Sequence, residues 1–403
     1  MAKQWICSQI GAREHYAIPN ALHQQGRLAG LVTDWYAPRT KALRWIGKRG
    51  RAALAARSEM IPDELVSAFP VSSLLWKWRV RRLSARGRIY DAYIQTDSAF
   101  AAAVARVKLP RHDIFFGYSY ASLETLIAEK KHGVLTVLDQ IDPGALEFQL
   151  VAEEMSRFPE LAGSPPEFPA GYYERNRREW DAAHRVVVNS LFCREALIKQ
   201  GVNPEKLFVL PLCFEAKGEN PKPKTGSREP GQPLRILFLG QVILRKGIQY
   251  LLEAARRLES ENVGFDVVGP IGISATAVAM VPRNVVFHGR ATRDQAAEWY
   301  RRADLFVLPT LSDGFAITQL EAMSYGLPVI TTPCCGEVVS DGVDGFVVPP
   351  RDSEALAKVF QRYLAESELL GKQQQAALLK VKQFTLEQLS KNLHDLEVSL
   401  LNG

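Results

Sequence analysis

The sequence predicts an α/β protein with parallel sheets in two domains. At 403 residues, the chain is longer than a single hydrophobic core usually serves. Its clearest unit runs from Asp304 to Thr331, where a strand (DLFVLP), a loop of small residues, a short helix and a second strand (LPVIT) follow one another. A strand–helix–strand unit places its two strands parallel in one sheet. Residues 215–233 are rich in proline, glycine and charge, which is typical of a linker between domains.

Residues 1–214 are expected to form the first domain, because short apolar runs alternate with helical stretches along them. The turn after the first run opens a helix that is expected to reach about Gly26, and a charged helix is expected at Tyr172–Ala183. The expected strands are Gln4–Cys7, Leu31–Asp34, Asp113–Phe116, Val134–Leu138, Val186–Asn189 and Leu207–Leu212.

Residues 234–384 repeat the alternation and are expected to form the second domain. Helices are expected at Ile248–Leu258 and Gln319–Tyr325. A last helix, Thr385–Leu401 within residues 385–403, has apolar residues at helical spacing. The expected strands are Leu234–Gly240, Val263–Gly269, Val285–Gly289, Asp304–Pro309, Leu327–Thr331 and Gly345–Val348.

The loop after Asp304–Pro309 is the first candidate for a ligand site. It lies at the carboxyl end of a strand, where open α/β sheets bind ligands. Its small residues let backbone N–H groups approach an anion, and the helix behind it begins with partial positive charge. Asp313 and Glu321 stand at the two ends of a D-x7-E spacing. Two local alternatives remain open: Thr318-x-x-Glu321 also fits a helix capping box, and Asp313-Gly314 also fits an ordinary turn.

The stretch DGFAITQLEAMSYGLPVI resembles the E-x7-E motif of the retaining GT-B glycosyltransferases, in particular the GT4 family. The resemblance implies a GT-B fold, in which two Rossmann-like domains face a central cleft and the last helix crosses back to the N-terminal domain. It implies that Asp313 contacts hydroxyls of a donor sugar and that Glu321 holds the ribose of its nucleotide. Asp313 is one methylene shorter than the usual glutamate. The donor-binding residues implied between the two acids are Gly314, Phe315, Ala316, Ile317 and Thr318.

The loop after Leu234–Gly240 resembles the G-R-x(3–5)-K-G pattern of the same family, whose cations clamp the donor diphosphate. Gly240 and Lys246 match, whereas Gln241 stands at the usual arginine position, so the neighbouring Arg245 is expected to supply the charge. Cations are needed here because cleavage leaves negative charge on the nucleoside diphosphate. The alternative is solvated charge before a helix.

Three further residues are weaker candidates. Gly11 lies in the turn after the first strand, which the family places close to the donor phosphate, although plain turn geometry also needs a glycine there. Asp139 directly follows the expected strand Val134–Leu138. It is the best candidate for a catalytic acid or base in the first domain, although it could instead cap a helix. His288 precedes the main-chain groups that flank the nucleobase in the family, although its side chain could simply pack.

Charge and cysteine usage bear on partners and compartment. The net charge of +6 suits an anionic partner. Two basic, apolar stretches, Lys41–Arg57 and Trp76–Arg88, are typical either of helices on an anionic membrane surface or of solvated helix faces. No recognised nucleic-acid module accompanies this charge. The five cysteines form no C-x-x-C pair and the N-terminus lacks a signal-peptide run, which favours the cytoplasm, with contact at the inner face of the membrane as a further reading.

These features together predict a glycosyltransferase that moves a sugar from a nucleotide-diphospho-sugar to a glycan or lipid-linked acceptor, with retention of configuration. Bacterial polysaccharide or lipopolysaccharide assembly is the expected setting. No metal is expected, and the absence of G-x-G-x-x-G argues against a nicotinamide cofactor. The alternatives are a non-catalytic protein that binds nucleotide-sugars, and an epimerase or phosphorylase of the same fold.

Overall fold

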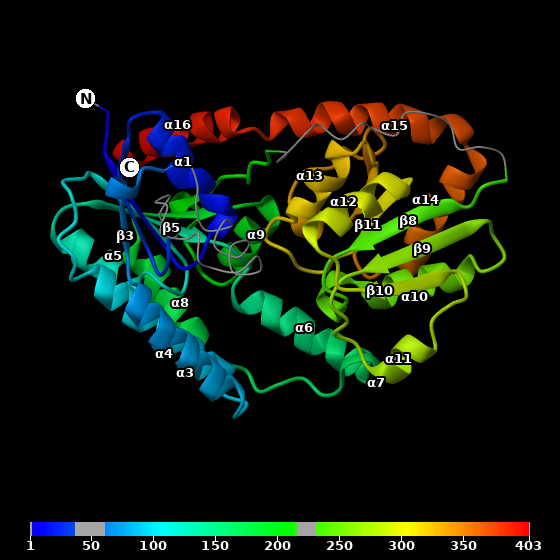
Figure 1. Cartoon of the computed structure of the whole chain (residues 1–403), viewed down its shortest axis with the longest axis horizontal. Coiled ribbons are helices and arrows are strands. Elements are labelled where there is room, and N and C mark those ends of the chain that lie inside the picture. Colours follow the sequence, from blue (N-terminus) through cyan, green and yellow to red (C-terminus); the bar gives the residue numbers. More distant parts are fainter. Residues whose placement is uncertain (1, 37–60, 216–230, 403) are drawn as a thin grey trace, which may run out of the picture.

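The computed structural model describes residues 2–36, 61–215 and 231–402. Within these ranges the chain forms two parallel sheets, each covered by helices on both faces (Figure 1). The α/β class and the two parallel sheets predicted from the sequence are therefore confirmed. The basic stretch Lys41–Arg57 and most of the expected linker lie outside the described residues.

The N-terminal sheet has the strand order β3-β2-β1-β4-β5-β6-β7 within the described ranges. All neighbouring strands run parallel. The chain order reverses between β1 and β4, and ligands bind at such a switch point in open α/β sheets. The strands are β1 Trp5–Gln9, β2 Leu28–Thr33, β3 Val66–Ala68, β4 Ile114–Tyr118, β5 Leu135–Gln140, β6 Arg185–Val188 and β7 Leu207–Val209.

Helices surround this sheet on both faces (Figure 1). The expected charged helix is confirmed as α8. The helix expected after the first strand begins later than predicted, because Glu14, His15 and Tyr16 have φ of 50°, 52° and 60°, which an α-helix cannot accommodate. The helices are α1 Ala17–Gln24, α3 Pro70–Ser84, α4 Ile89–Val104, α5 Leu123–Lys131, α6 Ala145–Arg157, α7 Pro159–Ala162, α8 Ala170–Ala182 and α9 Leu191–Lys199.

The C-terminal sheet has the order β10-β9-β8-β11-β12-β13 and is also parallel. Its switch point lies between β8 and β11. The strands match the predicted ones to within two residues: β8 Leu234–Leu239, β9 Val263–Val268, β10 Val285–Gly289, β11 Leu305–Leu308, β12 Val329–Thr331 and β13 Gly345–Val347. The helices are α10 Ile248–Arg257, α11 Ala275–Ala279, α12 Arg293–Arg302, α13 Ile317–Ser324, α14 Ser353–Ala365 and α15 Ser367–Lys380.

The last helix, α16 (Leu386–Leu401), packs on the N-terminal domain beside α1 (Figure 1). Its leucines join the core beneath β1 and β4. The Glu397 carboxylate is buried there, forms an ion pair with Arg27 and accepts a hydrogen bond from Trp5 Nε1 at 3.2 Å. Thus the chain returns to its first domain after completing the second.

Helix α6 makes the opposite crossing. It follows β5 of the N-terminal sheet, yet its Glu154 carboxylate is buried against the C-terminal domain. Glu154 accepts hydrogen bonds from Gln249 Nε2 and Tyr250 Oη, both at 2.8 Å, and pairs with Arg351 Nε at 2.8 Å. Figure 1 shows α6 between the two sheets.

We predict that Glu397→Ala destabilises the N-terminal domain, because it leaves the Arg27 guanidinium buried without its partner. Removing one member of a buried pair costs about 3–5 kcal/mol. Urea unfolding followed by tryptophan fluorescence measures this loss. The matched control is Glu387→Ala on the same helix, whose pair with Lys391 is 63% to 78% exposed and contributes little. Equal unfolding midpoints for the two variants would show that α16 does not depend on Glu397.

Candidate active site

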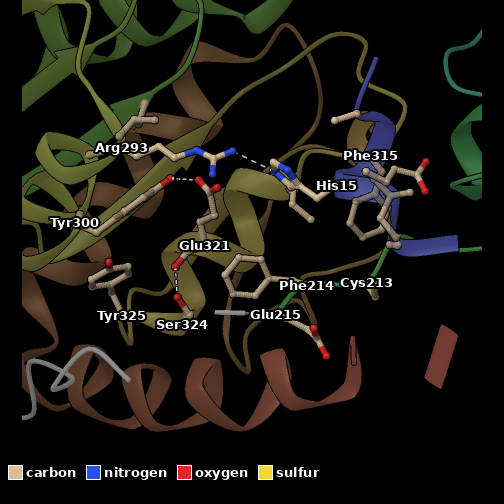
Figure 2. Close-up of a pocket in the computed structure, with 18 of the residues that line it drawn as sticks. His15, Cys213, Phe214, Glu215, Arg293, Tyr300, Phe315, Glu321, Ser324 and Tyr325 are labelled. Carbon is tan, nitrogen blue, oxygen red and sulfur yellow. Dashed lines mark hydrogen bonds between the residues drawn. The ribbon is translucent and has the colours of Figure 1, made fainter. Parts of the chain in front are cut away.

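A cavity of about 650 Å³ lies between the two domains. Figure 2 shows its walls converging from the loop after β1, from α12 and α13, and from residues 212–215, which leave the N-terminal domain. The walls combine apolar side chains with three acids, a histidine and an arginine. Its polar and aromatic lining residues include Glu14, His15, Asn20, Phe214, Thr292, Arg293, Tyr300, Phe315, Glu321 and Tyr325.

Glu321 lines this cavity from the second turn of α13 (Figure 2). Its Oε2 accepts a hydrogen bond from Tyr300 Oη at 2.9 Å. Burial and the Glu321 charge raise the pKa of Tyr300 well above its usual value, so the phenol remains a donor. The Tyr300 ring stacks on Tyr325, with centroids 5.2 Å apart. A carboxylate oriented in this way can accept hydrogen bonds from hydroxyl groups of a ligand.

The capping-box alternative for Glu321 is wrong. Helix α13 begins at Ile317, its N-cap is Ala316, and no side chain caps it. Thr318 therefore lies inside the first turn instead of preceding it. Phe315 and Ile317 line the cavity together with Glu321.

A contact between the domains lies among the lining residues of the cavity. Arg293 Nη2, on α12, lies 3.2 Å from His15 Nε2 on the N-terminal domain (Figure 2). Because a guanidinium can only donate, Nε2 of His15 accepts in this contact. The contact connects the loop after β1 to the C-terminal domain.

That loop has an unusual backbone. Glu14, His15 and Tyr16 occupy the left-handed region in succession, with φ between 50° and 60°. Each non-glycine residue there costs on the order of 1 kcal/mol. Two of the three residues, Glu14 and His15, line the cavity. Backbone strain placed at a ligand-sized hollow is typical of a functional loop.

Acidic groups gather beneath this loop. Burial raises the pKa of Glu14 to about 7, while Arg13 opposes the shift. Asp139, at the end of β5, is buried and paired in register with Tyr118 of β4. Burial, and next the charge of Glu14, raise the pKa of Asp139 well above its usual range. Asp139 is not among the lining residues of the cavity, whereas Glu14 is.

The two predicted cations meet the loop that contains the first predicted acid. Lys246 forms an ion pair with Asp313, and both side chains are less than 20% exposed. Arg245 Nη1 donates to the Ser312 carbonyl at 2.8 Å and to Glu147 Oε2 at 3.3 Å. Asp313 therefore binds a cation and does more than form a turn. None of these three predicted residues is among the lining residues of the cavity that contains Glu321.

The Asp313–Ala316 loop is pressed against the N-terminal domain. A Cβ at Gly314 would lie 2.2 Å from the Ile141 carbonyl oxygen and 2.7 Å from Asn189 Nδ2. Only glycine fits at this distance. The loop that follows β11 is thereby held against the carboxyl ends of β5 and β6.

The remaining predicted residues lie in different surroundings. Gly11 has φ of 75°, and its N–H donates to Asp34 Oδ1 at 2.7 Å. Gly240 has open space where a Cβ would stand, and its N–H donates to the Val268 carbonyl at 2.9 Å. His288 faces outward, where its Nε2 lies 2.7 Å from Asp266 Oδ1 and its ring packs on Trp299. It does not line the cavity.

Several residues of the site were not found from the sequence. Glu14, His15, Arg293 and Tyr300 occur in no motif, and only their positions just after a strand or on the next helix could have marked them. Glu147 lies far from its partners Arg245 and Ser312 in the sequence. Within residues 2–36, 61–215 and 231–402, no group of three or more histidine, cysteine or acidic side chains is placed to hold a metal ion.

Part of this chain is similar in sequence to known glycosyltransferases. Residues 233–366 match the family described as Glycosyl transferases group 1. The chain is 27% identical over 213 residues to the D-inositol 3-phosphate glycosyltransferase of Streptomyces griseus subsp. griseus, covering 47% of this chain and 45% of that protein. It is 29% identical over 181 residues to the amylovoran biosynthesis glycosyltransferase AmsK of Erwinia amylovora, covering 41% of this chain and 44% of that protein. The chain thus spans less than half the length of these relatives.

Among solved structures, the crystal structure of Anabaena Alr3699/HepE in complex with UDP resembles this one with a TM-score of 0.59. The two chains are 16% identical, and the similarity covers 98% of this chain and 100% of that chain. At this low sequence identity, the structural similarity shows that the two chains share a fold. The chain therefore has the GT-B fold, and residues 233–366 are similar to the family described as Glycosyl transferases group 1.

Proposed function

We propose that this protein is a glycosyltransferase that takes a sugar from a nucleotide-diphospho-sugar. The observation that carries the proposal is the position of Glu321. It projects into a cavity between the domains from the helix that directly follows the Asp313–Ala316 loop, and that loop contacts both Lys246 and the N-terminal domain. In this proposal Glu321 is the ribose-binding acid, Lys246 is the cation for the diphosphate and Asp313 is the sugar-binding acid.

In this proposal the nucleoside occupies the cavity and its ribose hydroxyls donate to Glu321. The diphosphate extends toward Lys246 and Arg245, and it replaces Asp313 as the partner of Lys246. Asp313 is then released to accept hydrogen bonds from the sugar. The UDP bound in the HepE structure supports a nucleoside diphosphate as the ligand class.

The proposal includes the finer features that the E-x7-E resemblance implies. Transfer proceeds with retention, as in GT4 enzymes, and the cations of the chain balance the leaving diphosphate without a metal or other cofactor. The acceptor is a glycan or a lipid-linked glycan in a bacterial polysaccharide pathway, a setting supported by the name of the amylovoran biosynthesis relative.

A nucleotide-sugar-binding protein without transferase activity is the second candidate. It is favoured by Gln241, which removes one expected cation, and by Glu147, which already neutralises Arg245. Slow hydrolysis of the donor, measured as release of free sugar, separates an enzyme from a binding protein.

We also propose that helix α3 rests on an anionic membrane surface. Val71, Leu74, Leu75 and Trp78 recur at helical spacing and are 73%, 59%, 63% and 58% exposed. Exposed cations, including Lys77, Arg81 and Arg82, flank this apolar stripe. Apolar residues in the interface together with cations toward anionic headgroups stabilise such binding.

This contact would hold a cytoplasmic protein at the inner face of the membrane, where lipid-linked acceptors are available. Among the helices in the described part of the chain, none combines the length and apolar character needed to span a bilayer.

We predict that Glu321→Ala weakens nucleotide binding by about tenfold to a hundredfold, because charged hydrogen bonds contribute about 1.5–3 kcal/mol. Thermal stabilisation by UDP, GDP and ADP measures the effect, since a ligand of the native state raises its stability by mass action. Glu298→Ala, an exposed acid of the same domain, is the control and should bind like the wild type.

We predict that Lys246→Ala weakens UDP binding by at least tenfold and leaves uridine binding unchanged, because only the diphosphate contacts the ammonium group. Isothermal titration with UDP and with uridine measures the difference. Lys358→Ala serves as a control, since this lysine forms an exposed pair on α14. Unchanged nucleotide affinity in both Lys246→Ala and Glu321→Ala would place the donor site elsewhere.

We predict that a variant with Arg79, Arg81 and Arg82 changed to glutamine loses association with vesicles containing anionic phosphatidylglycerol. Each cation near such a surface contributes about 1 kcal/mol, so the loss is on the order of a hundredfold. Vesicle co-sedimentation measures it. A variant with Arg256, Arg257 and Lys358 changed to glutamine alters the net charge equally on the other domain and should bind normally. Equal binding by both variants would make α3 an ordinary solvated face.

A further inference from the structure

Seven aromatic rings meet on the N-terminal domain, away from the cavity that contains Glu321. They come from the starts of α4 and α8, from α6, from the loop before α8 and from the turn after β4. Tyr120 and Tyr172 stack with centroids 4.3 Å apart, and Phe168 and Tyr173 stack at 5.3 Å. This aromatic cluster consists of Tyr90, Tyr93, Tyr120, Phe148, Phe168, Tyr172 and Tyr173.

The cluster is not an ordinary core. Phe168 is 43% exposed and Tyr93 is 37% exposed, while Tyr90, Tyr172 and Tyr173 are half-buried. The hydroxyls of Tyr90, Tyr93, Tyr172 and Tyr173 have no hydrogen-bond partner within the described parts of the chain. Buried tyrosines usually find such partners. Ring faces and unpaired hydroxyls are therefore both available to a ligand.

The base of the cluster is rigid. Tyr120 has φ of 72°, and this conformation is held by the buried Glu179, whose carboxylate accepts the Tyr120 N–H at 2.5 Å. Arg175 Nε donates to the Tyr120 carbonyl at 2.8 Å, and the Tyr120 hydroxyl donates to Asp142 at 2.9 Å. With its backbone held at two points and its hydroxyl at a third, Tyr120 supports its stacking partner Tyr172 with little loss of entropy on binding.

The cluster adjoins the loop that contains Ser312 and Asp313. Phe148 follows Glu147 on α6, and Glu147 accepts from Ser312 Oγ at 2.8 Å, one residue before Asp313. Burial raises the pKa values of Tyr90 and Tyr173. Neighbouring tyrosines, Asp142 in the case of Tyr173, and then the Glu147 charge add to the shifts. A ligand resting on these rings would therefore lie beside the loop where the transferred sugar is placed.

We propose that the aromatic cluster is a binding platform for an uncharged sugar ring of the acceptor. This inference rests on the proposed transferase function, which it extends to the acceptor side. The apolar C–H face of a pyranose packs on the aromatic rings, and its hydroxyls bond to the free tyrosine hydroxyls. Tyrosine supplies both surfaces in one side chain.

The surrounding charge selects against other ligands. Burial raises the pKa values of Tyr172 and Tyr173, and the nearby acids Asp97, Asp142 and Glu147 add to the shifts. An anionic phosphate at this position would meet these acids, which supply it with no counter-charge. A hydrocarbon chain would cover the rings but would leave four phenol hydroxyls without partners, which costs free energy on burial.

Saturation-transfer NMR on the full chain with UDP tests the platform. The probes are the methyl α- and β-glycosides of glucose, galactose, mannose and N-acetylglucosamine, with farnesyl phosphate as the lipid probe. We expect at least one glycoside to bind, with transfer concentrated on the C–H groups of one ring face. Phe168→Ala and Tyr173→Ala should each weaken it by about tenfold, and Tyr172→Phe by about fivefold through loss of a hydroxyl.

Met280→Ala is the control, because it removes a large apolar side chain that is 70% exposed on the other domain and should leave glycoside binding normal. UDP stabilisation should persist in all variants, and the isosteric Tyr172→Phe keeps the test decisive if an alanine variant does not fold. UDP stabilisation without binding of any glycoside, or with equal binding by wild type and Tyr172→Phe, overturns the platform but not the donor site. Binding of farnesyl phosphate with the same residue dependence also overturns it. Glycoside binding without UDP stabilisation would instead count against the proposed donor site.

Discussion

Two buried carboxylates determine how the halves of this chain face each other. Glu154, on the helix after β5, is enclosed by Gln249, Tyr250 and Arg351 of the C-terminal domain. Glu397, on the last helix, is enclosed by Arg27 and Trp5 of the N-terminal domain. A buried carboxylate is stable only where donors replace its hydration shell. Helix α6 is therefore fixed to the C-terminal domain and α16 to the N-terminal domain. These two contacts set how the domains lie on either side of the cavity.

The constraint at Glu154 extends to the loop that contains Asp313. Glu147 and Glu154 are two helical turns apart on α6 and lie on the same face. When Glu154 is bound by the C-terminal domain, Glu147 lies against Ser312 and Arg245. The N-terminal domain thus contributes the acid that orients a cation of the C-terminal domain. A rotation of one domain against the other would separate Glu147 from Arg245 and Ser312. A change in domain arrangement would therefore also change the charges around the loop that contains Asp313.

The sequence predicted the parts of the fold and the site that depend on local pattern. Alternating apolar runs located the strands, and D-x7-E located Asp313 and Glu321 on the loop and helix that the structure has. Contacts that join distant segments left no such pattern. Nothing near Glu147 marks Arg245 as its partner, and nothing near His15 marks Arg293. The three left-handed residues after β1 are equally hidden, because none of them is glycine or asparagine and only the tertiary contacts of the loop can hold them there.

The pair between Lys246 and Asp313 explains how such a site can remain charged without a ligand. An ammonium group as buried as that of Lys246 needs a counter-charge, and the short side chain of Asp313 supplies it. Under the proposed function, a diphosphate takes over this role, so its binding exchanges one ion pair for another and does not create an unpaired charge. In this proposal Asp313 becomes available to sugar hydroxyls only when the diphosphate has bound. Recognition of the sugar would therefore be coupled to the arrival of the diphosphate, because in the free protein the Asp313 carboxylate is paired with Lys246.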